Sequence, residues 1–473
     1  ARDGAGSRDG VITVEATAGA VNVTGGSGQT AIGSIGHGGT WRSGGAGDTL
    51  NGNINITAGT NVNVLGVTGA GSDGGSAQIG HNGADTDSTK TGNIEITAGG
   101  ELDLTGGNRT NRFAVVGHGG SNNTTGNGSG TITVSAASID LNAGSANETM
   151  VQIGHGGEAN NGTQSGTLDI TATTGDITLD AGTAGSNAYA QIGNGGDGGT
   201  GAKSGVISVT ADAGNISLNG GSTGGEDSYA QIGHGGAETS GGFGSDSLTV
   251  AATAGTVMVT GGSAGTDNYA MIGLGGAGSA GTSAGAVSVS GTAVSLNGGS
   301  AGNANIAQIG SGSVFGTGLH TGAVSVSATD AGGAGIALNG GNGGRASAQI
   351  GNGGINNDNN HSGAITVNSA AGITAQAGGG NISHVQIGHG GTDAGGNFGG
   401  AIDVDAGGAI SFTAGTANET YAQIGHGGRQ SIGDFTGGID VLAGGDITFA
   451  GSSGTRAYAQ LGHGGDHEGG DGQ

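Results

Sequence analysis

Apolar and polar residues alternate in short stretches along the whole chain. TITVSA (131–136) and VISVTA (206–211) place an apolar side chain at every second position, and similar stretches follow closely behind, such as SIDLNA (138–143) and NISLNG (215–220). Alternation over about five residues, bounded by glycine, predicts β-strands with one face turned inward. No stretch of useful length has the period of a helix, so the pattern predicts an all-β protein.

A third element, YAQIG or a close variant, completes a repeat. The residue that follows Ile-Gly, or its equivalent, marks each copy, and the markers are 37 to 44 residues apart. A fixed period in this range predicts a solenoid, a propeller or another repeat array. The twelve markers are His37, His81, His118, His155, Asn194, His234, Leu274, Ser311, Asn352, His389, His426 and His463.

The side chains of YAQIG are predicted to face two ways. Ala190 and Ile192 point inward, and Tyr189 and Gln191 point outward. Nothing larger than valine occurs at the position of Ala190 in any copy, as a tight interior requires. In eight of eleven links, 13 residues separate a marker from the first apolar residue of the next strand. This constant length predicts a structured glycine-rich arc that stacks from copy to copy.

These features predict a right-handed parallel β-solenoid, a single array over residues 1–473 with no separate domain. Each copy forms one coil, and three short strands form its walls. With neighbouring strands roughly 4.8 Å apart, twelve coils give a rod of about 58 Å. A propeller is the alternative, but its blades number four to eight and each contains four strands.

Composition narrows the class of function. The chain has 121 Gly, no Pro and no Cys, which excludes collagen and disulfide scaffolds. A net charge of −25 disfavours nucleic-acid binding, and no apolar run has the length of a membrane span. Link lengths vary little and no coil differs chemically from its neighbours, so we predict no catalytic residues and no enzyme.

The G-x-I-T-V-x-A and G-x-I-x-L-x-G pairs, punctuated by YAQIGHGG, resemble the repeat regions of filamentous-haemagglutinin-like exoproteins. Members of that family are bacterial adhesins secreted by the two-partner route. The resemblance covers residues 11 to 465. It implies an elongated extracellular β-helix at the bacterial cell surface or in the biofilm matrix.

Histidine at the marker has two interpretations. Rings on successive coils could bind a transition metal or pass protons, with His389, His426 and His463 as candidate ligands. Alternatively, the tight G-x-G-G turn needs a side chain that hydrogen-bonds backbone groups, which the amides of Asn194 and Asn352 also do. We predict no metal and a structural ladder of largely neutral rings. The histidines of this ladder are His37, His81, His118, His155, His234, His389, His426 and His463.

Two further columns flank the marker. Glutamines such as Gln191, Gln231, Gln423 and Gln460 are predicted to form amide ladders along the rod. The five tyrosines share one column, where they pack against a loop or a neighbouring molecule, or form a glycan-binding wall with the glutamines. These tyrosines are Tyr189, Tyr229, Tyr269, Tyr421 and Tyr458. Acidic turns leave loosely bound Ca²⁺ as a candidate, but their spacing is not that of calcium-binding repeats, so no cofactor is predicted.

The sequence therefore predicts a structural protein, a segment of an extracellular β-solenoid fibre or adhesin stalk. The alternative is a binding module that contacts glycans along the Gln/Tyr wall or holds a metal on the histidine ladder. Neither end of the array carries a recognisable cap. We therefore expect the coils to continue in a longer chain or to stack end to end with other copies.

Overall fold

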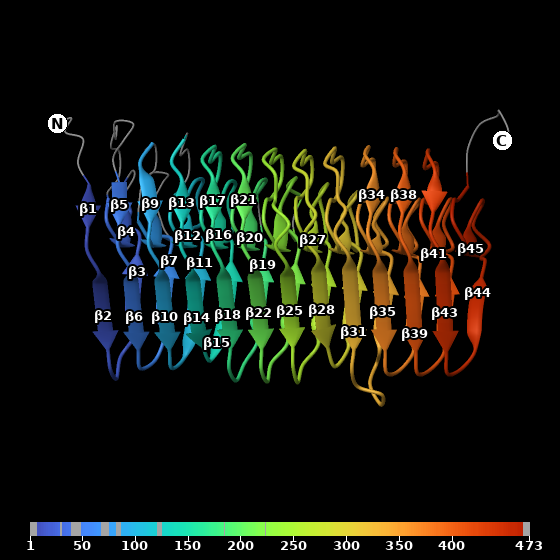
Figure 1. The fold of residues 1–473 in the computed structure, drawn as a ribbon, viewed down its shortest axis with the longest axis horizontal. Coiled ribbons are helices and arrows are strands. Elements are labelled where there is room, and N and C mark those ends of the chain that lie inside the picture. Colours follow the sequence, from blue (N-terminus) through green and yellow to red (C-terminus); the bar gives the residue numbers. More distant parts are fainter. Residues whose placement is uncertain are drawn as a thin grey trace.

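The computed structural model describes residues 7–28, 31–38, 49–67, 75–81, 87–120, 125–183, 185–222 and 224–466. These residues form 45 strands and no helix. Each strand of the three main sheets pairs in parallel with its counterpart one coil away. Figure 1 shows the coils side by side along the longest axis, with the N-terminus and the C-terminus at opposite ends. The predicted parallel β-solenoid with three strands per coil is confirmed.

Three twelve-stranded sheets form the walls of the rod. The first wall contains β2 (Ile12–Ala16), β6 (Ile54–Ala58), β10 (Ile94–Ala98), β14 (Ile132–Ala136), β18 (Leu168–Ala172), β22 (Ile207–Ala211), β25 (Leu248–Ala252), β28 (Val287–Gly291), β31 (Val324–Ala328), β35 (Ile365–Ser369), β39 (Ile402–Ala406) and β43 (Ile439–Ala443). The second wall contains β3 (Val21–Thr24), β7 (Val62–Leu65), β11 (Glu101–Thr105), β15 (Ser138–Asn142), β19 (Ile177–Asp180), β23 (Ile216–Asn219), β26 (Val257–Thr260), β29 (Val294–Asn297), β32 (Ile336–Asn339), β36 (Ile373–Gln376), β40 (Ile410–Thr413) and β44 (Ile447–Ala450). The third wall, built from the YAQIG element, contains β4 (Ile32–Ile35), β8 (Ser76–Ile79), β12 (Ala114–Val116), β16 (Met150–Ile153), β20 (Tyr189–Ile192), β24 (Tyr229–Ile232), β27 (Ala270–Ile272), β30 (Ala307–Ile309), β33 (Ala348–Ile350), β37 (His384–Ile387), β41 (Tyr421–Ile424) and β45 (Tyr458–Leu461).

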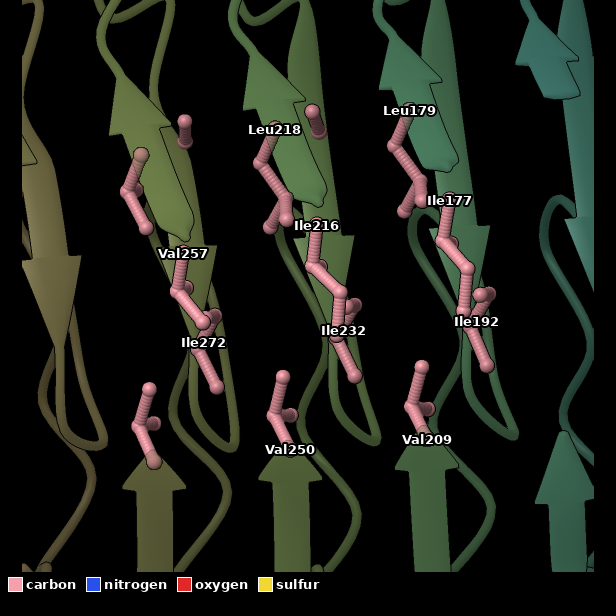
Figure 2. Packing of buried hydrophobic residues seen from close by; sticks show 14 of the residues in the cluster. Ile177, Leu179, Ile192, Val209, Ile216, Leu218, Ile232, Val250, Val257 and Ile272 are labelled. Carbon is pink, nitrogen blue, oxygen red and sulfur yellow. The ribbon is translucent and has the colours of Figure 1, made fainter. Parts of the chain in front are cut away.

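The three walls enclose one continuous apolar core. Val209 of the first wall, Ile216 of the second wall and Ile232 of the third wall are completely buried. Figure 2 shows how this arrangement recurs in the next coil, with Val250 and Val257 in the corresponding places. Burying a side chain of this size stabilises the fold by about 1.5–3 kcal/mol. One coil cannot enclose such a core alone, which is why the stack is the folding unit.

The arc joins each third-wall strand to the next first-wall strand. Its described residues include short strands that pair from coil to coil. Residues 39–48, 82–86 and 121–124 of the first three arcs lie outside the described residues. Short paired strands form a fourth column within the arc, which the sequence did not predict because two or three residues carry no readable alternation. These strands are β1 (Arg8–Asp9), β5 (Thr49–Asn51), β9 (Thr89–Thr91), β13 (Gly128–Ser129), β17 (Gln164–Ser165), β21 (Lys203–Ser204), β34 (His361–Ser362), β38 (Phe398–Gly399) and β42 (Phe435–Thr436).

The arc covers the third wall. A second apolar cluster contains third-wall side chains such as Tyr229 and Met271 together with arc side chains such as Ala237 and Ile355. All four residues of β20 are consequently buried. Tyr189 and Gln191 do point away from the main core, as predicted, but they enter this second compartment and do not reach solvent.

Close approach of neighbouring coils explains the high glycine content. Gly233, at the end of β24, has φ +151°, and a side chain there would collide with the carbonyl oxygen of Gly273 one coil later. Glycine is needed at such a position for space and for backbone conformation. None of the described residues belongs to a helix that could cross a membrane.

Candidate functional site

The marker histidines form a column of backbone contacts along the rod. From the second coil onward, each Nδ1 lies 3.0–3.1 Å from the backbone N–H of the preceding coil's marker, as with His118 Nδ1 and His81 N. Nε2 lies 2.7–3.0 Å from the carbonyl oxygen of the glycine two residues before a first-wall strand, as with His234 Nε2 and Gly205 O. Each marker ring from His81 onward therefore links three segments of backbone.

These contacts determine the protonation of the rings. A backbone N–H only donates, so Nδ1 must be the unprotonated nitrogen. A carbonyl oxygen only accepts, so Nε2 must carry the hydrogen. The column therefore holds its histidines as the neutral Nε2–H tautomer, and a proton added at Nδ1 would oppose the N–H that this nitrogen now accepts.

The pKa values of the ring column agree with this geometry. Burial lowers the pKa of four rings to about 4, namely His81, His155, His234 and His426. Burial, with a further contribution from His426, lowers the pKa of His389 to about 3. Burial and then the charges of His155 and His81 hold the pKa of His118 well below its ordinary value. Neutrality at pH 7 thus comes mainly from burial, and repulsion between neighbouring rings adds a smaller contribution.

Asparagine at the marker reproduces both contacts of histidine. Asn194 Oδ1 accepts the N–H of His155 at 2.9 Å, and its Nδ2 donates to the carbonyl of Gly166 at 3.2 Å. Ser311 supplies a more distant acceptor, with Oγ 3.3 Å from the backbone nitrogen of Leu274. Leu274 itself has no side-chain acceptor. The hydrogen-bonding interpretation of the marker therefore fits every polar residue type found there.

The same contacts bear on the metal alternative. The rings of His389, His426 and His463 stack with centroids 4.9 Å apart. However, Nδ1 and Nε2 of His426 already contact the backbone at 3.1 and 2.9 Å. Coordination would break one backbone contact at every ligand, because a metal needs a free nitrogen lone pair. Within the described ranges, no three residues of the types His, Asp and Glu are grouped so as to hold a metal ion.

Within the described coils, the glutamines of the third wall contact backbone and not one another, so the predicted amide ladder is wrong. Gln78 Nε2 donates to the carbonyl oxygens of Gly117 and Gly119, both at 2.8 Å. The same pair of glycine carbonyls in the next G-x-G turn receives Nε2 of Gln231, Gln308 and Gln423. Stacked turns bring these carbonyls closer to Nε2 than the neighbouring amide, and local sequence could not show this. In the last described coil, Gln460 Nε2 donates to the carbonyl of His463 at 3.0 Å.

The tyrosines are covered by the arc. Tyr189, Tyr229 and Tyr269 stack with ring centroids 4.9 Å apart and are 2%, 0% and 0% exposed. Tyr421 is also fully buried, whereas Tyr458 in the last coil is half-buried. A glycan cannot reach the buried rings, so the predicted glycan-binding wall is wrong at these four positions. The tyrosines pack beneath the arc, which was the other predicted arrangement, and burial raises the pKa of their hydroxyls.

A column in the arc, nine residues after most markers, was not predicted. Burial lowers the pKa of Lys90 and Lys203 to about 8, and Lys203 Nζ donates to the carbonyl of Gly199 at 2.7 Å. Further along, His320 and His361 stack with centroids 5.4 Å apart. The constant spacing was the available signal, but the residue type at this position changes from coil to coil. Its members are Lys90, Gln164, Lys203, Phe243, Ser283, His320, His361, Phe398 and Phe435.

Charged residues of the arc and the turn before the third wall form two contrasting segments. The acidic segment consists of Glu148, Glu158, Asp197, Asp227, Glu238 and Asp267. The paired segment consists of Arg345, Asp393, Glu419, Arg429, Arg456 and Asp466. In the paired segment, arginine and carboxylate alternate in one network, with nitrogen–oxygen distances from 2.6 to 3.7 Å.

Comparison with known proteins identifies no relative of this chain, because no protein-family model, no curated protein and no solved structure matches it.

Proposed function

We propose that this chain is structural, a segment of an extracellular β-solenoid fibre or adhesin stalk. The observation that carries the proposal is the unbroken register of the three twelve-stranded walls. Opposite residues are equivalent from coil to coil, as with Tyr189 and Tyr229 or Ile192 and Ile232. Such a ladder makes each coil the template of the next and gives a rod whose length scales with its number of coils.

Two observations favour a structural role over a binding module. The marker rings spend both nitrogens on backbone contacts, as His426 does with His389 N and Gly400 O. The tyrosines with the best stacking surface, such as Tyr229, are buried. The polar and aromatic residues that recur most regularly therefore bind and pack against neighbouring coils, and are not available to a ligand.

The proposed partner of the rod is another copy of the same protein, stacked end to end against its edge strands. β43, β44 and β45 lie at the edges of the three walls. Leu442, Ile447 and Leu461 are 63%, 46% and 49% exposed on these strands. Exposed strand edges pair readily with other strands, and apolar side chains beside them add to the attraction.

Immunogold electron microscopy of cells that produce the chain tests its proposed location and role. Antibodies against the exposed faces of the first and second walls should label fibres or a surface layer outside the cell. Label confined to the cytoplasm would contradict the proposal. A glycan array and a Zn²⁺ titration of the purified chain test the alternative function, a binding module. Stoichiometric binding in either experiment would favour that alternative over a structural role.

A further inference from the structure

The compartment between the third wall and the arc contains a row of unpaired carbonyl oxygens. Seven glutamines of the third wall have a buried Oε1 with no hydrogen-bond partner among the residues that the structure describes. They are Gln78, Gln152, Gln191, Gln231, Gln308, Gln386 and Gln423. Their orientation follows from the contacts of Nε2: that of Gln152 lies 2.9 Å from the carbonyl oxygens of both Gly193 and Gly195, so the nitrogen must face them.

The residues that replace glutamine show which space these oxygens face. Val115 lies opposite Gln78 and Gln152 in the third wall, and Met271 lies opposite Gln231 and Gln308. Both replacements belong to the apolar cluster under the arc. The glutamine oxygens therefore end in the same buried compartment and are out of reach of bulk water.

Leaving these oxygens without donors would be costly. A buried acceptor with no partner loses the hydrogen bonds that it makes to water in the unfolded chain. Seven such losses would together be comparable to the whole net stability of a typical domain. A donor inside the compartment is therefore required.

We propose that ordered water molecules run in file beside the glutamine column, each donating to the Oε1 atoms of two adjacent coils. Equivalent side chains of adjacent coils in the third wall are spaced like the stacked rings of Tyr189 and Tyr229, whose centroids are 4.9 Å apart. A water molecule with two donor contacts of about 2.8 Å spans acceptors roughly 4.5 Å apart, which matches this repeat. Buried waters that satisfy such groups are a regular part of protein interiors. This inference does not depend on the proposed function.

The replacements divide the file into separate segments. Gln152, Gln191 and Gln231 form one segment, and Met271 separates it from the segment that begins at Gln308. Val115 isolates Gln78 from both. The fold already accepts methionine at this position, so a substitution between glutamine and methionine is a conservative probe of the file.

Crystal structures at atomic resolution of the unmodified chain, Gln191→Met and Met271→Gln test the proposal. We expect a water peak about 2.8 Å from Oε1 of Gln152, Gln191 and Gln231, and none beside Met271. Gln191→Met should lose a peak, and Met271→Gln should gain one that joins the two segments.

Two results would overturn the proposal. A dry compartment, or protein donors within hydrogen-bond distance of Oε1, would remove the need for water. An anomalous peak beside Oε1 after a rubidium soak would show that a monovalent cation, and not water, occupies the row.

Discussion

The acidic segment and the paired segment occupy corresponding places on the coil but treat charge in opposite ways. Arg429 lies 2.6 Å from Asp393 and 2.7 Å from Glu419, so each carboxylate has a cation beside it. In the acidic segment, burial and then neighbouring carboxylates raise the pKa of Asp197 and Asp267 to about 7. Neighbouring carboxylates repel these two, and their ionisation at neutral pH opposes the fold.

The arc charges differ between the two segments, whereas the architecture of the coil does not. The three walls and the apolar core continue through both segments. The charges therefore do not specify the coil; they adjust the local stability of a coil that the backbone ladder already specifies.

Acidification should remove the stability that the marker histidines contribute in both segments. The ring pKa of His155 and His234 is about 4 in the fold against 6.5 when free, so the unfolded chain binds protons first as the pH falls. The stability from each ring is complete above pH 6.5 and is lost as the pH falls towards 4, at roughly 3 kcal/mol per ring. Urea unfolding followed by circular dichroism between pH 7.5 and 4 measures the loss.

The acidic segment should change in the opposite sense over the same range. The pKa of Asp197 is about 7 in the fold against 3.8 when free, so this segment gains stability as the pH falls from 7 towards 4. Because more rings than carboxylates are involved, the whole rod should lose stability. A rod that becomes steadily more stable down to pH 4 would contradict the account of the marker column.

Removing Arg429 should break the middle of the paired network. Its side chain is 8% exposed and bridges Asp393 and Glu419, so Arg429→Gln takes one of two arginine partners from each of these part-buried carboxylates. We expect a loss of about 3 kcal/mol in the free energy of unfolding, read as faster hydrogen exchange around residues 393–429. Arg456→Gln is the matched control, because that side chain is 29% exposed and its loss should cost less than about 1 kcal/mol. Equal effects of the two substitutions would show that burial of the network does not matter.

Neutralising one carboxylate in each segment should give effects of opposite sign. Asp393→Asn removes the partner of Arg345 and Arg429 and should destabilise the rod by about 2 kcal/mol at pH 8. Asp197→Asn removes a repelled charge and should stabilise it by about 1 kcal/mol at pH 8, with no gain at pH 4. Denaturant unfolding of the two variants at both pH values measures this contrast. The same sign for both substitutions at pH 8 would end the distinction between the segments.

Backbone strain at the turn before the third wall should give the smallest effect. Ile382 has φ +62°, a left-handed conformation that a β-branched residue adopts only at a cost. Ile382→Gly should therefore raise the free energy of unfolding by about 0.5–1 kcal/mol. Asn187 occupies the corresponding position beside the acidic segment, with φ +57°. Asn187→Gly should change the free energy of unfolding little, because asparagine tolerates this conformation. A thermal melt of both variants compares them, and equal shifts would rule out strain at Ile382.

Alternation and repeat length predicted the walls because both are local properties of the chain. Ile132, Val134 and Ala136 alternate with polar residues, and all three are buried in the first wall. The same reasoning placed Ala190 and Ile192 in the core. Each prediction needed the direction of a side chain relative to its own strand, and the period of two supplies that direction.

What packs over the outward face could not be predicted in this way. Tyr229 and Gln231 point away from the core, but the arc returns over them and buries them. The bridge from Arg345 to Asp393 joins residues 48 positions apart on different turns, and no local pattern connects them. Asparagine replaces histidine at some markers, such as Asn194, and this replacement indicates a hydrogen-bonding position. The partners at that position, such as Gly166, belong to other coils, so the sequence alone does not reveal them.

The most direct test of the account is nitrogen-15 NMR of the histidine rings in the folded chain, recorded from pH 8 to pH 4 with and without Zn²⁺. The account predicts that the marker rings between His81 and His426 appear as the single neutral tautomer with hydrogen on Nε2, do not titrate near pH 6.5, and are unchanged by zinc. Rings that titrate at their ordinary pKa, or Nδ1 signals that shift with stoichiometric zinc, would contradict a structural column and favour a metal-binding or proton-carrying one.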